Sequence, residues 1–260
     1  MAADRFVGKT AIVTGGASGI GRAVAVRLAA EGGNVVVVDR DRQLGEATVG
    51  DLGGSGRHGF ICADVSSRTA VDSASDEVVS LYGGIDILIN NAGILRVAPA
   101  LETSDELFDE VVANNLRSVF LFSTAVARQM VRSGTGGRIV NISSIHAVVS
   151  EPNASAYTAA KGGIEAYSRT LASELAVHGI TVNCVRPGAT WTELTRPIYT
   201  PEVLQALKMR IPLAAPCQPE AIAAGVAYLA SDEAAYVTGT TLDIDGGYIM
   251  DGSLPAARYT

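Results

Sequence analysis

The sequence has few of the residues that mark several functional classes. Its three cysteines are an odd number without metal-ligand spacing, so neither a disulfide framework nor a metal site is expected. No block of consecutive basic residues occurs and the net charge is −7, which argues against nucleic acid or an anionic membrane as a partner. No signal-peptide pattern and no run of about 18 uncharged apolar residues is found, so we expect a cytoplasmic protein.

What the chain does have is material for one large core. Of its 260 residues 48% are hydrophobic and 18% charged, which is a globular composition. Aromatic residues make up only 5% and there are 28 glycines, which suits tight turns between strands and closely packed helices. We therefore expect a single domain over residues 1–260.

Short β-branched apolar runs alternate with longer amphipathic stretches along the chain. These runs predict strands at 10–14, 35–39, 59–63, 85–90, 138–142, 181–185 and 241–244. The stretches between them predict helices near 19–31, 41–52, 67–82, 104–132, 154–178 and 218–231, with Asp41, Ser67 and Ser104 as N-caps. This alternation implies right-handed crossovers, so we predict an α/β fold: a doubly wound three-layer sandwich with a seven-stranded parallel sheet and helices on both faces.

One stretch breaks the alternation. Six of the nine prolines fall within 187–219, and no glycine occurs between Gly188 and Gly225. Such a long insertion after a strand predicts a functional lid at about 188–217. A surface excursion that merely links two helices is the alternative.

The first predicted strand leads into a glycine-rich turn, TGGASGIG at 14–21. Its glycines allow positive φ and a close approach of bare backbone to a pyrophosphate, and the helix that follows offers free N–H groups to the phosphates. A glycine-rich turn alone is weak support. The strand before it, the helix after it, and Asp39 at the end of the next strand strengthen the prediction of a dinucleotide site.

Asp39 lies 18 residues after Gly21, at the spacing from which a carboxylate can accept both ribose hydroxyls of an adenosine. A 2′-phosphate beside this carboxylate would be repelled, so NAD is favoured over NADP. Arg40 leaves an alternative open, because its guanidinium could reach a phosphate instead of lying over the adenine or in solvent.

Tyr157 and Lys161 are four residues apart in a helical pattern, so both side chains emerge on one face. Small neighbours such as Ala160 and Gly162 leave open space beside them. A tyrosine that acts as a base near neutrality needs its pKa lowered by roughly 3 units, about 4 kcal/mol. One ammonium at about 4 Å supplies energy of this order.

Together these features resemble the short-chain dehydrogenase/reductase family, in its single-domain branch that binds NAD or NADP. The resemblance spans nearly the whole chain, through TGGASGIG at 14–21, Asp39, Asp64-Val65, NNAG at 90–93, Asn115, ISS at 142–144, YTAAK at 157–161, PGATWT at 187–192, and VTG and DGG towards the end. It implies a Rossmann-type fold and an oxidoreductase that acts on CH–OH groups.

The resemblance also implies roles for individual residues. Tyr157 matches the general acid/base, and Lys161 matches the group that lowers its pKa and holds the nicotinamide ribose. Ser144 matches the hydroxyl that polarises the substrate oxygen, and Asn115 matches the side chain that holds a water between Lys161 and solvent. The implied cofactor-binding residues are Gly15, Ser18, Gly19, Ile20, Gly21, Asp39, Arg40, Asp64, Val65, Asn91, Ala92, Gly93, Tyr157, Lys161, Pro187, Gly188, Thr190 and Thr192.

Some of these positions have a plainer interpretation. For Asp64 and Thr190 the alternative is ordinary turn or strand-end chemistry. Asn90 is interpreted as structural, joining neighbouring strands.

The reacting group is a secondary alcohol or ketone, whose oxygen we expect between Ser144 and Tyr157. The residues predicted to contact the substrate are Arg96, Ser144, His146, Asn153, Tyr157 and Trp191. Several are polar, which suits a polyhydroxylated ligand. His146 fits a loop hydrogen bond equally well, and Trp191 fits packing of the lid.

A narrower resemblance, to bacterial glucose 1-dehydrogenases, is carried by Ser144-Ile145-His146, Pro152-Asn153, Ile211-Pro212 and the tail after DGG. Ala147 and Val148 depart from it where acidic residues are usual, and Asp39 favours NAD. A sugar or polyol is the first prediction for the substrate. The alternatives are a cyclic or secondary alcohol and a 3-oxoacyl thioester.

A function of another class is a dinucleotide-binding protein without turnover. The presence of Ser144, Tyr157, Lys161 and Asn115 together argues against it. The resemblance implies a homotetramer in which the helices at 104–132 and 154–178 pair across a twofold axis.

Overall fold

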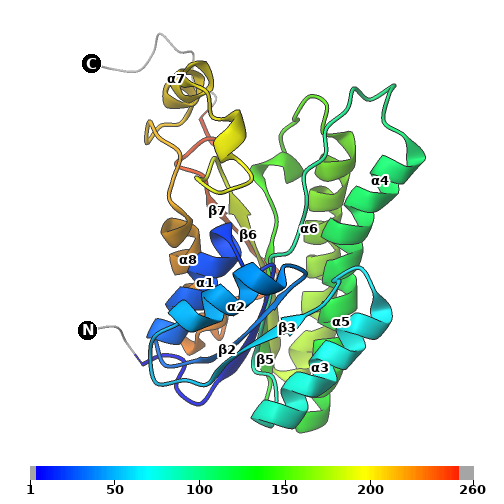
Figure 1. Ribbon diagram of the computed structural model, residues 1–260, viewed down its shortest axis with the longest axis vertical. Coiled ribbons are helices and arrows are strands. Elements are labelled where there is room, and N and C mark those ends of the chain that lie inside the picture. Colours follow the sequence, from blue (N-terminus) through cyan, green and yellow to red (C-terminus); the bar gives the residue numbers. More distant parts are fainter. Residues whose placement is uncertain (1–3, 252–260) are drawn as a thin grey trace.

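The computed structural model describes residues 4–251 and is built around one twisted sheet (Figure 1). The strands are β1 (Thr10–Thr14), β2 (Asn34–Asp39), β3 (His58–Cys62), β4 (Ile87–Asn90), β5 (Gly137–Ile142), β6 (Ile180–Pro187) and β7 (Thr241–Ile244). Their order is β3-β2-β1-β4-β5-β6-β7, and each neighbouring pair is parallel. The predicted seven-stranded parallel sheet is confirmed.

Helices cover both faces of this sheet, as predicted (Figure 1). One face carries α1 (Gly19–Ala30), α2 (Arg42–Asp51) and α8 (Pro219–Ala230). The other carries α3 (Arg68–Tyr82), α5 (Ser118–Ser133) and α6 (Ser155–Leu175), while α4 (Asp105–Val112) lies beside α6. Together these layers form the three-layer sandwich.

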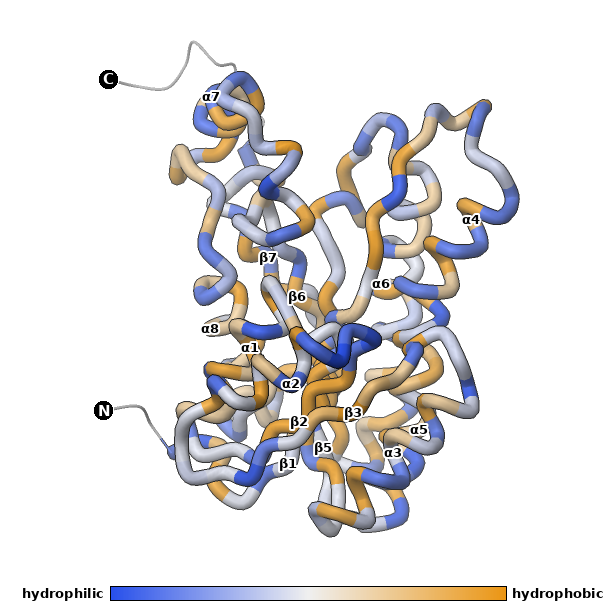
Figure 2. The backbone as a smooth tube through the Cα atoms, in the orientation of Figure 1, coloured by the Kyte–Doolittle hydropathy of each residue, from blue (hydrophilic) through white to orange (hydrophobic). Residues whose placement is uncertain are grey.

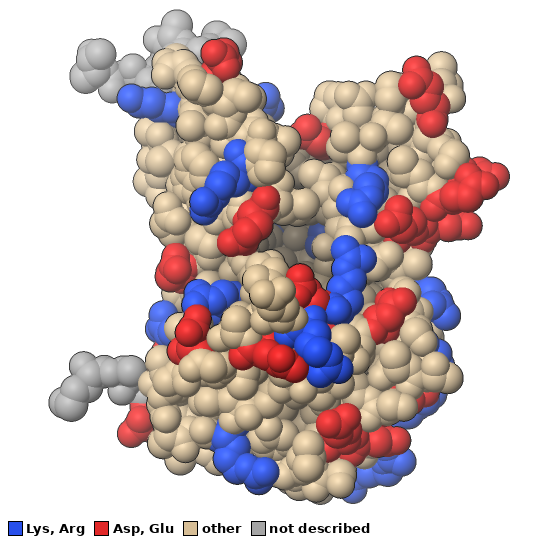
Figure 3. Space-filling view, in the orientation of Figure 1, with Lys and Arg blue, Asp and Glu red and all other residues tan. Residues whose placement is uncertain are grey.

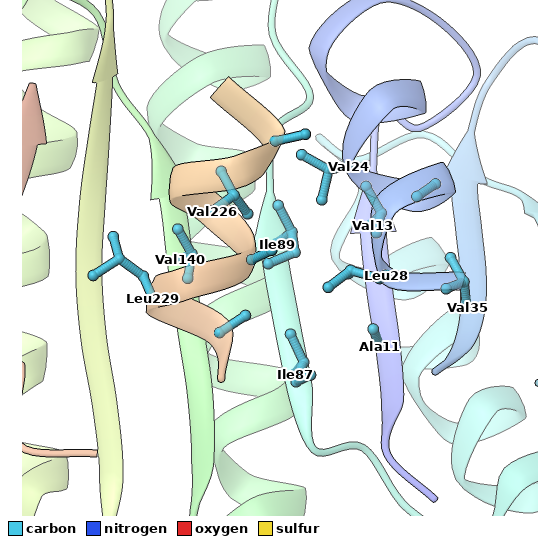
Figure 4. Close-up of a cluster of buried hydrophobic side chains, with 14 of the residues drawn as sticks. Ala11, Val13, Val24, Leu28, Val35, Ile87, Ile89, Val140, Val226 and Leu229 are labelled. Atoms are coloured by element: carbon cyan, nitrogen blue, oxygen red, sulfur yellow. The ribbon is translucent and has the colours of Figure 1, made fainter. Parts of the chain in front are cut away.

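The apolar strands are explained by burial on both faces. In β2, Val35 and Val37 join the core under α1 and α8, while Val36 and Val38 join the core on the opposite face. All four are almost completely buried, and each stabilises the fold by about 2 kcal/mol. Figure 4 shows Val24 and Leu28 of α1 and Val226 and Leu229 of α8 over the strands, and Figure 2 shows the hydrophobic strands at the centre.

The predicted N-caps Asp41, Ser67 and Ser104 are confirmed, since each side chain accepts a hydrogen bond from the backbone N–H three residues later. The helix predicted near 104–132 is confirmed as a continuous helical run, but it is not α-helical throughout. Between α4 and α5 the chain makes a π-helical turn over Ala113–Arg117. Its cause is local, because the amides of Asn114 and Asn115 donate to the backbone oxygens of Glu110 and Val111.

The 188–217 segment contains a helix that the sequence analysis does not predict. This helix, α7 (Pro201–Arg210), begins after the N-cap Thr200 and buries none of its residues. It stands away from the sheet at the upper left of Figure 1. The base of the segment is closed by a parallel bridge between Thr190 and Cys217.

Asn90 has the structural role assigned to it. Its Nδ2 donates to Asn141 Oδ1 at 2.8 Å and to Ser123 Oγ at 3.0 Å, and Asn141 Nδ2 donates to Ser168 Oγ at 2.8 Å. This buried chain of amides and hydroxyls joins β4, β5, α5 and α6.

The strand order also locates the functional end of the molecule. The chain passes from β1 outward to β2 and β3, then returns to place β4 on the other side of β1. A crevice opens at the carboxyl ends of two strands where the winding reverses, and in such sheets this is where ligands bind.

Candidate active site

The glycine-rich turn lies at this reversal point, after β1. Gly15 and Gly19 have φ of +62° and +52°, a conformation that favours glycine. A Cβ on Gly21 would lie 2.1 Å from the oxygen of Gly15 and 2.4 Å from Nδ2 of Asn91, so no larger residue fits there. Ser18, the N-cap of α1, makes no side-chain capping bond, which leaves the first N–H groups of the helix to a ligand.

Asn91, the residue after β4, holds this turn in place. Its Nδ2 donates to the backbone oxygens of Thr14 and Gly15 at 3.1 and 2.9 Å, and the hydroxyl of Thr14 accepts from the N–H groups of Asn91 and Ala92. The turn and the NNAG segment are therefore one rigid unit.

Asp39 lies at the rim of the turn. Its carboxylate accepts hydrogen bonds from the N–H of Ala17 at 3.2 Å and of Asp41 at 3.1 Å. Asp64 instead accepts from the N–H and hydroxyl of Ser66, and these bonds, with a smaller contribution from Arg40, lower its pKa. The contacts of Asp64 are thus those of an ordinary turn. The positive charge of Arg40 lies near enough to Asp64 to act on its carboxylate.

The reactive side chains come together one strand further along. Tyr157 and Lys161 lie on α6, and Ser144 follows β5. The hydroxyl of Ser144 lies close enough to the phenol of Tyr157 to lower its pKa, and Lys161 Nζ lies 5.5 Å from the centre of the Tyr157 ring. Lys161 and Ser144 are only 5% and 7% exposed, so the charge of Lys161 acts in a poorly solvated place.

Burial is the largest cause of the pKa shifts of both Lys161 and Tyr157. It lowers the pKa of Lys161 to about 8. It raises the pKa of Tyr157, and the hydroxyl of Ser144 opposes that rise. The expected lowering of the phenol's pKa is not what the chain alone produces, because burial raises this pKa and only Ser144 opposes the rise.

The π-helical turn delivers Asn115 to the same site. Its Nδ2 donates to the oxygens of Ile94 and Val111, both at 2.9 Å, while its buried Oδ1 has no hydrogen-bond partner in the described chain. A Cβ on Gly93 would lie 2.4 Å from this Oδ1 and 3.9 Å from Lys161 Nζ. An unpaired acceptor so close to the lysine fits a bridging water.

The start of the 188–217 segment reaches the glycine-rich turn. A Cβ on Gly19 would lie 3.4 Å from both Thr192 and the carboxylate of Glu193. Thr190 donates to the oxygen of Gly188 at 3.0 Å, which is the strand-end chemistry considered for it. Gly188 itself follows Pro187 and touches Asp245, so β6, β7 and the segment meet here.

Figure 3 shows a hollow at the centre of the molecule, between the sides carrying α7 and α4, with charges of both signs around it. His146 Nε2 lies 3.5 Å from a carboxylate oxygen of Glu151, and burial lowers the pKa of His146 while Glu151 opposes this. Arg96 pairs with Glu110 at 3.5 Å. His146 and Arg96 thus have loop partners of their own.

The positions of two other predicted substrate residues, Asn153 and Trp191, are set by backbone conformation and by ring packing. Asn153 has φ of +66° and its oxygen accepts a bond from Ala98. The ring of Trp191 packs edge-on against Tyr199 at 5.0 Å, which is the lid packing considered for it.

Two charged residues beside the site are missing from the sequence analysis. Glu165 lies one turn beyond Lys161 on α6, and Arg186 lies in β6, where its guanidinium pairs with the Glu165 carboxylate. The four-residue spacing of Tyr157, Lys161 and Glu165 is the sequence signal that could have found Glu165.

Two kinds of site are not found among residues 4–251. No group of three or more His, Cys, Asp or Glu side chains in this range is placed to hold a metal ion. Nor does any described helix combine the length and apolar character that a membrane span requires.

Comparison with known proteins places these features in a family. Residues 15–249 match a family model described as enoyl-(acyl carrier protein) reductase. The chain is 42% identical over 248 residues to D-threitol dehydrogenase of Mycolicibacterium smegmatis, covering 95% of both chains. It is 38% identical over 245 residues to 3-oxoacyl-[acyl-carrier-protein] reductase of Escherichia coli, covering 94% of this chain and 99% of the other.

Solved structures agree. A short-chain type dehydrogenase/reductase from Mycobacterium marinum superimposes with a TM-score of 0.91 at 33% identity, over 95% of this chain and 98% of the other. The chain therefore belongs to the short-chain dehydrogenase/reductase family, whose enzymes bind a nicotinamide cofactor and interconvert CH–OH and carbonyl groups.

Proposed function

We propose that the protein is an NAD-dependent dehydrogenase of small polyols or sugars. The observation that carries this proposal is the convergence of Ser144, Tyr157, Lys161 and the unpaired Oδ1 of Asn115 beside a dinucleotide turn rimmed by Asp39. A non-catalytic dinucleotide-binding protein would not need this convergence.

The crevice fits a dinucleotide through its own residues. The turn at Gly15 to Gly21 and the free N–H groups of α1 would hold the pyrophosphate, and Asn91 to Gly93 would line the path towards Lys161. When bound, the nicotinamide accepts or supplies the hydride. We assign the remaining predicted contacts, Arg40, Asp64, Val65, Pro187, Gly188, Thr190 and Thr192, to the same ligand.

The chain's side chains manage the proton. Tyr157 Oη would take the proton of the alcohol during oxidation and return it during reduction. Ser144 would hold the reacting oxygen, since its hydroxyl acts on the phenol. Lys161 would favour the ionised phenol, and Asn115 would hold the water that passes protons between Lys161 and solvent.

Asp39 supports NAD rather than NADP. Its carboxylate accepts hydrogen bonds from the N–H groups of Ala17 and Asp41 at the turn. A 2′-phosphate bound here would add roughly two negative charges beside this carboxylate and would be repelled. Arg40 is a weaker argument for NADP, because its guanidinium could pair with a 2′-phosphate. Its charge already acts on Asp64, whose pKa it lowers.

The polyol is supported by the polar side chains of the predicted substrate residues and by the likeness to D-threitol dehydrogenase. Arg96, His146, Asn153 and Trp191 would contact the part of the substrate beyond the reacting carbon. We propose that the 188–217 segment closes over it as a lid, within a chain that acts as one dinucleotide-binding domain.

A second candidate is reduction of a 3-oxoacyl thioester. It is favoured by the 38% identity to the Escherichia coli reductase and by the description of the matching family model. The lid carries Glu193 and Glu202 as well as Arg196 and Arg210, so it has no purely basic surface for an acidic carrier protein.

The deciding experiment follows absorbance at 340 nm. NAD or NADP is mixed with D-threitol, other tetritols and pentitols, glucose or cyclic alcohols, and NADH or NADPH with a 3-oxoacyl thioester. We expect oxidation of polyols with NAD, and a loss of about 10³-fold in the Tyr157→Phe variant. Equal rates in wild type and variant would refute the tyrosine-based chemistry, and turnover confined to the thioester would favour the second candidate.

We also propose that the protein is a homotetramer. An apolar groove of about 410 Å³ lies between α5 and α6 and is lined by Ala127, Val131, Leu171 and Leu175 with two arginines at its edge. Two copies that meet at this face across a twofold axis would cover both grooves as a dimer, and a second twofold interface would complete the tetramer.

A further inference from the structure

The carboxylate of Glu165 is buried close to the reactive group. Only 5% of the residue is exposed, and it lies on α6 one turn beyond Lys161. Arg186 donates to both of its oxygens, from Nε at 2.9 Å and from Nη2 at 2.7 Å. The hydroxyl of Ser143 donates a third bond at 2.7 Å. Both oxygens of this carboxylate are therefore held by named partners.

Arg186 extends the connection across the sheet. It lies in β6, and its Nη1 donates to Asp243 of β7 at 2.6 Å. The network therefore joins α6, the end of β5, β6 and β7. The elements that it joins carry Tyr157, Ser144 and the base of the 188–217 segment.

Ser143 is the point at which this network meets the reactive residues. It lies between Ile142, whose oxygen accepts the bond from Lys161 Nζ at 2.8 Å, and Ser144. Its own N–H donates to Val185 of β6 at 2.8 Å. A shift of Ser143 would move the acceptor of Lys161 and the hydroxyl of Ser144 together.

Stability alone is a poor explanation for such a pair. Removing two charges from water costs several kcal/mol per ion, and well-packed apolar residues often replace a buried ion pair without loss of stability. The chain has a suitable comparison in Glu31, a buried carboxylate held by Arg5 and Arg27. Glu31 follows α1 at the amino ends of the strands, opposite the active site.

We propose that Glu165, oriented by Arg186, is a positioning residue that uses the hydroxyl of Ser143 to hold Ser144 and the acceptor of Lys161 in register with Tyr157. This role rests on the proposed function. It predicts that the kinetics depend on the Ser143–Glu165 hydrogen bond and not on a buried carboxylate as such.

The test compares Ser143→Ala, Glu165→Gln, the double variant and Glu31→Gln with wild type, using a polyol that wild type oxidises. Ser143→Ala is the sharpest change, because Glu165 keeps both bonds from Arg186 and no buried charge loses its partner. For each protein kcat, KM, the pH dependence of kcat, NADH affinity by fluorescence, and the thermal midpoint are measured.

We expect Ser143→Ala and Glu165→Gln each to lower kcat about tenfold, within the roughly 100-fold loss that a 1 Å misplacement can produce. KM and NADH affinity should change less than twofold. The acidic limb of kcat should move to higher pH, because a loosened Lys161 favours the ionised phenol less. The double variant should lose no more than the worse single variant, since both act on the same Ser143–Glu165 hydrogen bond, which Ser143→Ala removes and Glu165→Gln weakens.

Glu31→Gln should lower the thermal midpoint and leave kcat and its pH dependence unchanged. Variants at 143 and 165 that match wild type, losses that multiply in the double variant, or an equal kcat loss in Glu31→Gln would each overturn the positioning role. A wild type that binds NADH but oxidises no alcohol would instead refute the proposed function and this role with it.

Discussion

Lys161 Nζ lies 5.5 Å from the ring centre of Tyr157 and donates a hydrogen bond to the oxygen of Ile142 at 2.8 Å. The ammonium is held between a phenol and a main-chain oxygen in a place that burial makes unfavourable for charge. Function and stability therefore make opposite demands on this lysine.

The Lys161→Met variant should be more stable and inactive. Burial lowers the pKa of Lys161 from 10.5 to about 8, so the folded chain carries the charge at pH 7 at a cost that methionine removes. After the lost hydrogen bond is allowed for, we expect a gain of about 1–2 kcal/mol in unfolding free energy at pH 7. Chemical denaturation should show this gain, and turnover should be lost.

The pH dependence checks the cause of that gain. Because the folded pKa lies below the unfolded value, wild type binds fewer protons when folded and should become more stable as pH rises from 8 to 10.5. The variant lacks this dependence, so the two stabilities should converge over that window. A constant difference across it would show that charge burial is not the cause.

Cofactor preference should depend on Asp39. Replacing its carboxylate in Asp39→Ser removes the repulsion of a 2′-phosphate and one acceptor of the ribose hydroxyls. We expect the ratio of kcat/KM for NAD over NADP to fall by tenfold or more, about 1.4 kcal/mol. Initial rates with both cofactors provide the measurement, and an unchanged ratio would remove Asp39 as the determinant.

The glycine-rich turn should be sensitive to substitution at Gly21, in contrast to the open helical position Gly50. The Gly21→Ala variant places a Cβ 2.1 Å from the oxygen of Gly15, which forces the turn open, so NADH affinity should fall at least tenfold. Gly50→Ala in α2 is the matched control, since its Cβ meets nothing within 4 Å. It should gain about 0.5–1 kcal/mol of stability and bind NADH normally.

Acid stability should depend on Glu31. Burial alone would raise the pKa of Glu31, but hydrogen bonds from Arg5 and Arg27 outweigh it, so the pKa lies below the ordinary 4.5. The stabilisation is complete above pH 4.5 and is lost as pH falls through the lower folded value. Glu31→Gln should lose about 1–3 kcal/mol at pH 7 and should show less of this acid dependence in urea titrations.

Assembly should depend on the groove between α5 and α6. Val131→Glu places a charge on its lining at a position that is 36% exposed, so the monomer fold should tolerate it while association is blocked. Light scattering should give a smaller assembly for this variant than for wild type. Leu44→Glu, an exposed apolar position on α2, should leave the mass unchanged.

The sheet and the dinucleotide turn could be predicted because they depend on local patterns. Runs such as Val35 to Val38 fit only a strand buried on both faces, and glycines at 15 and 21 are required by contacts that the turn makes. The π-helical turn could not be predicted, because it arises where the side chain of Asn115 competes with backbone hydrogen bonds.

The sequence could not predict that Glu165 and Arg186 pair, because the two residues are 21 positions apart and meet only through the packing of α6 on β6. Of the site's chemistry, the spacing of Tyr157 and Lys161 predicted which groups meet. It did not predict that burial would dominate the pKa of the phenol.

The π-helical turn at Ala113–Arg117 changes the direction in which the side chains of the helical run point before and after it. Each residue rotates an α-helix by about 100°, so an additional residue in one turn offsets everything after it by that angle. Asn115 can thereby point inward while α5, directly after it, directs Val126 and Met130 to the sheet and Val131 to the outer groove. Deleting one residue here would rotate α5 by about 100° relative to Asn115. The side chain proposed to hold the relay water and the groove proposed to bind a second copy would then no longer both keep their directions.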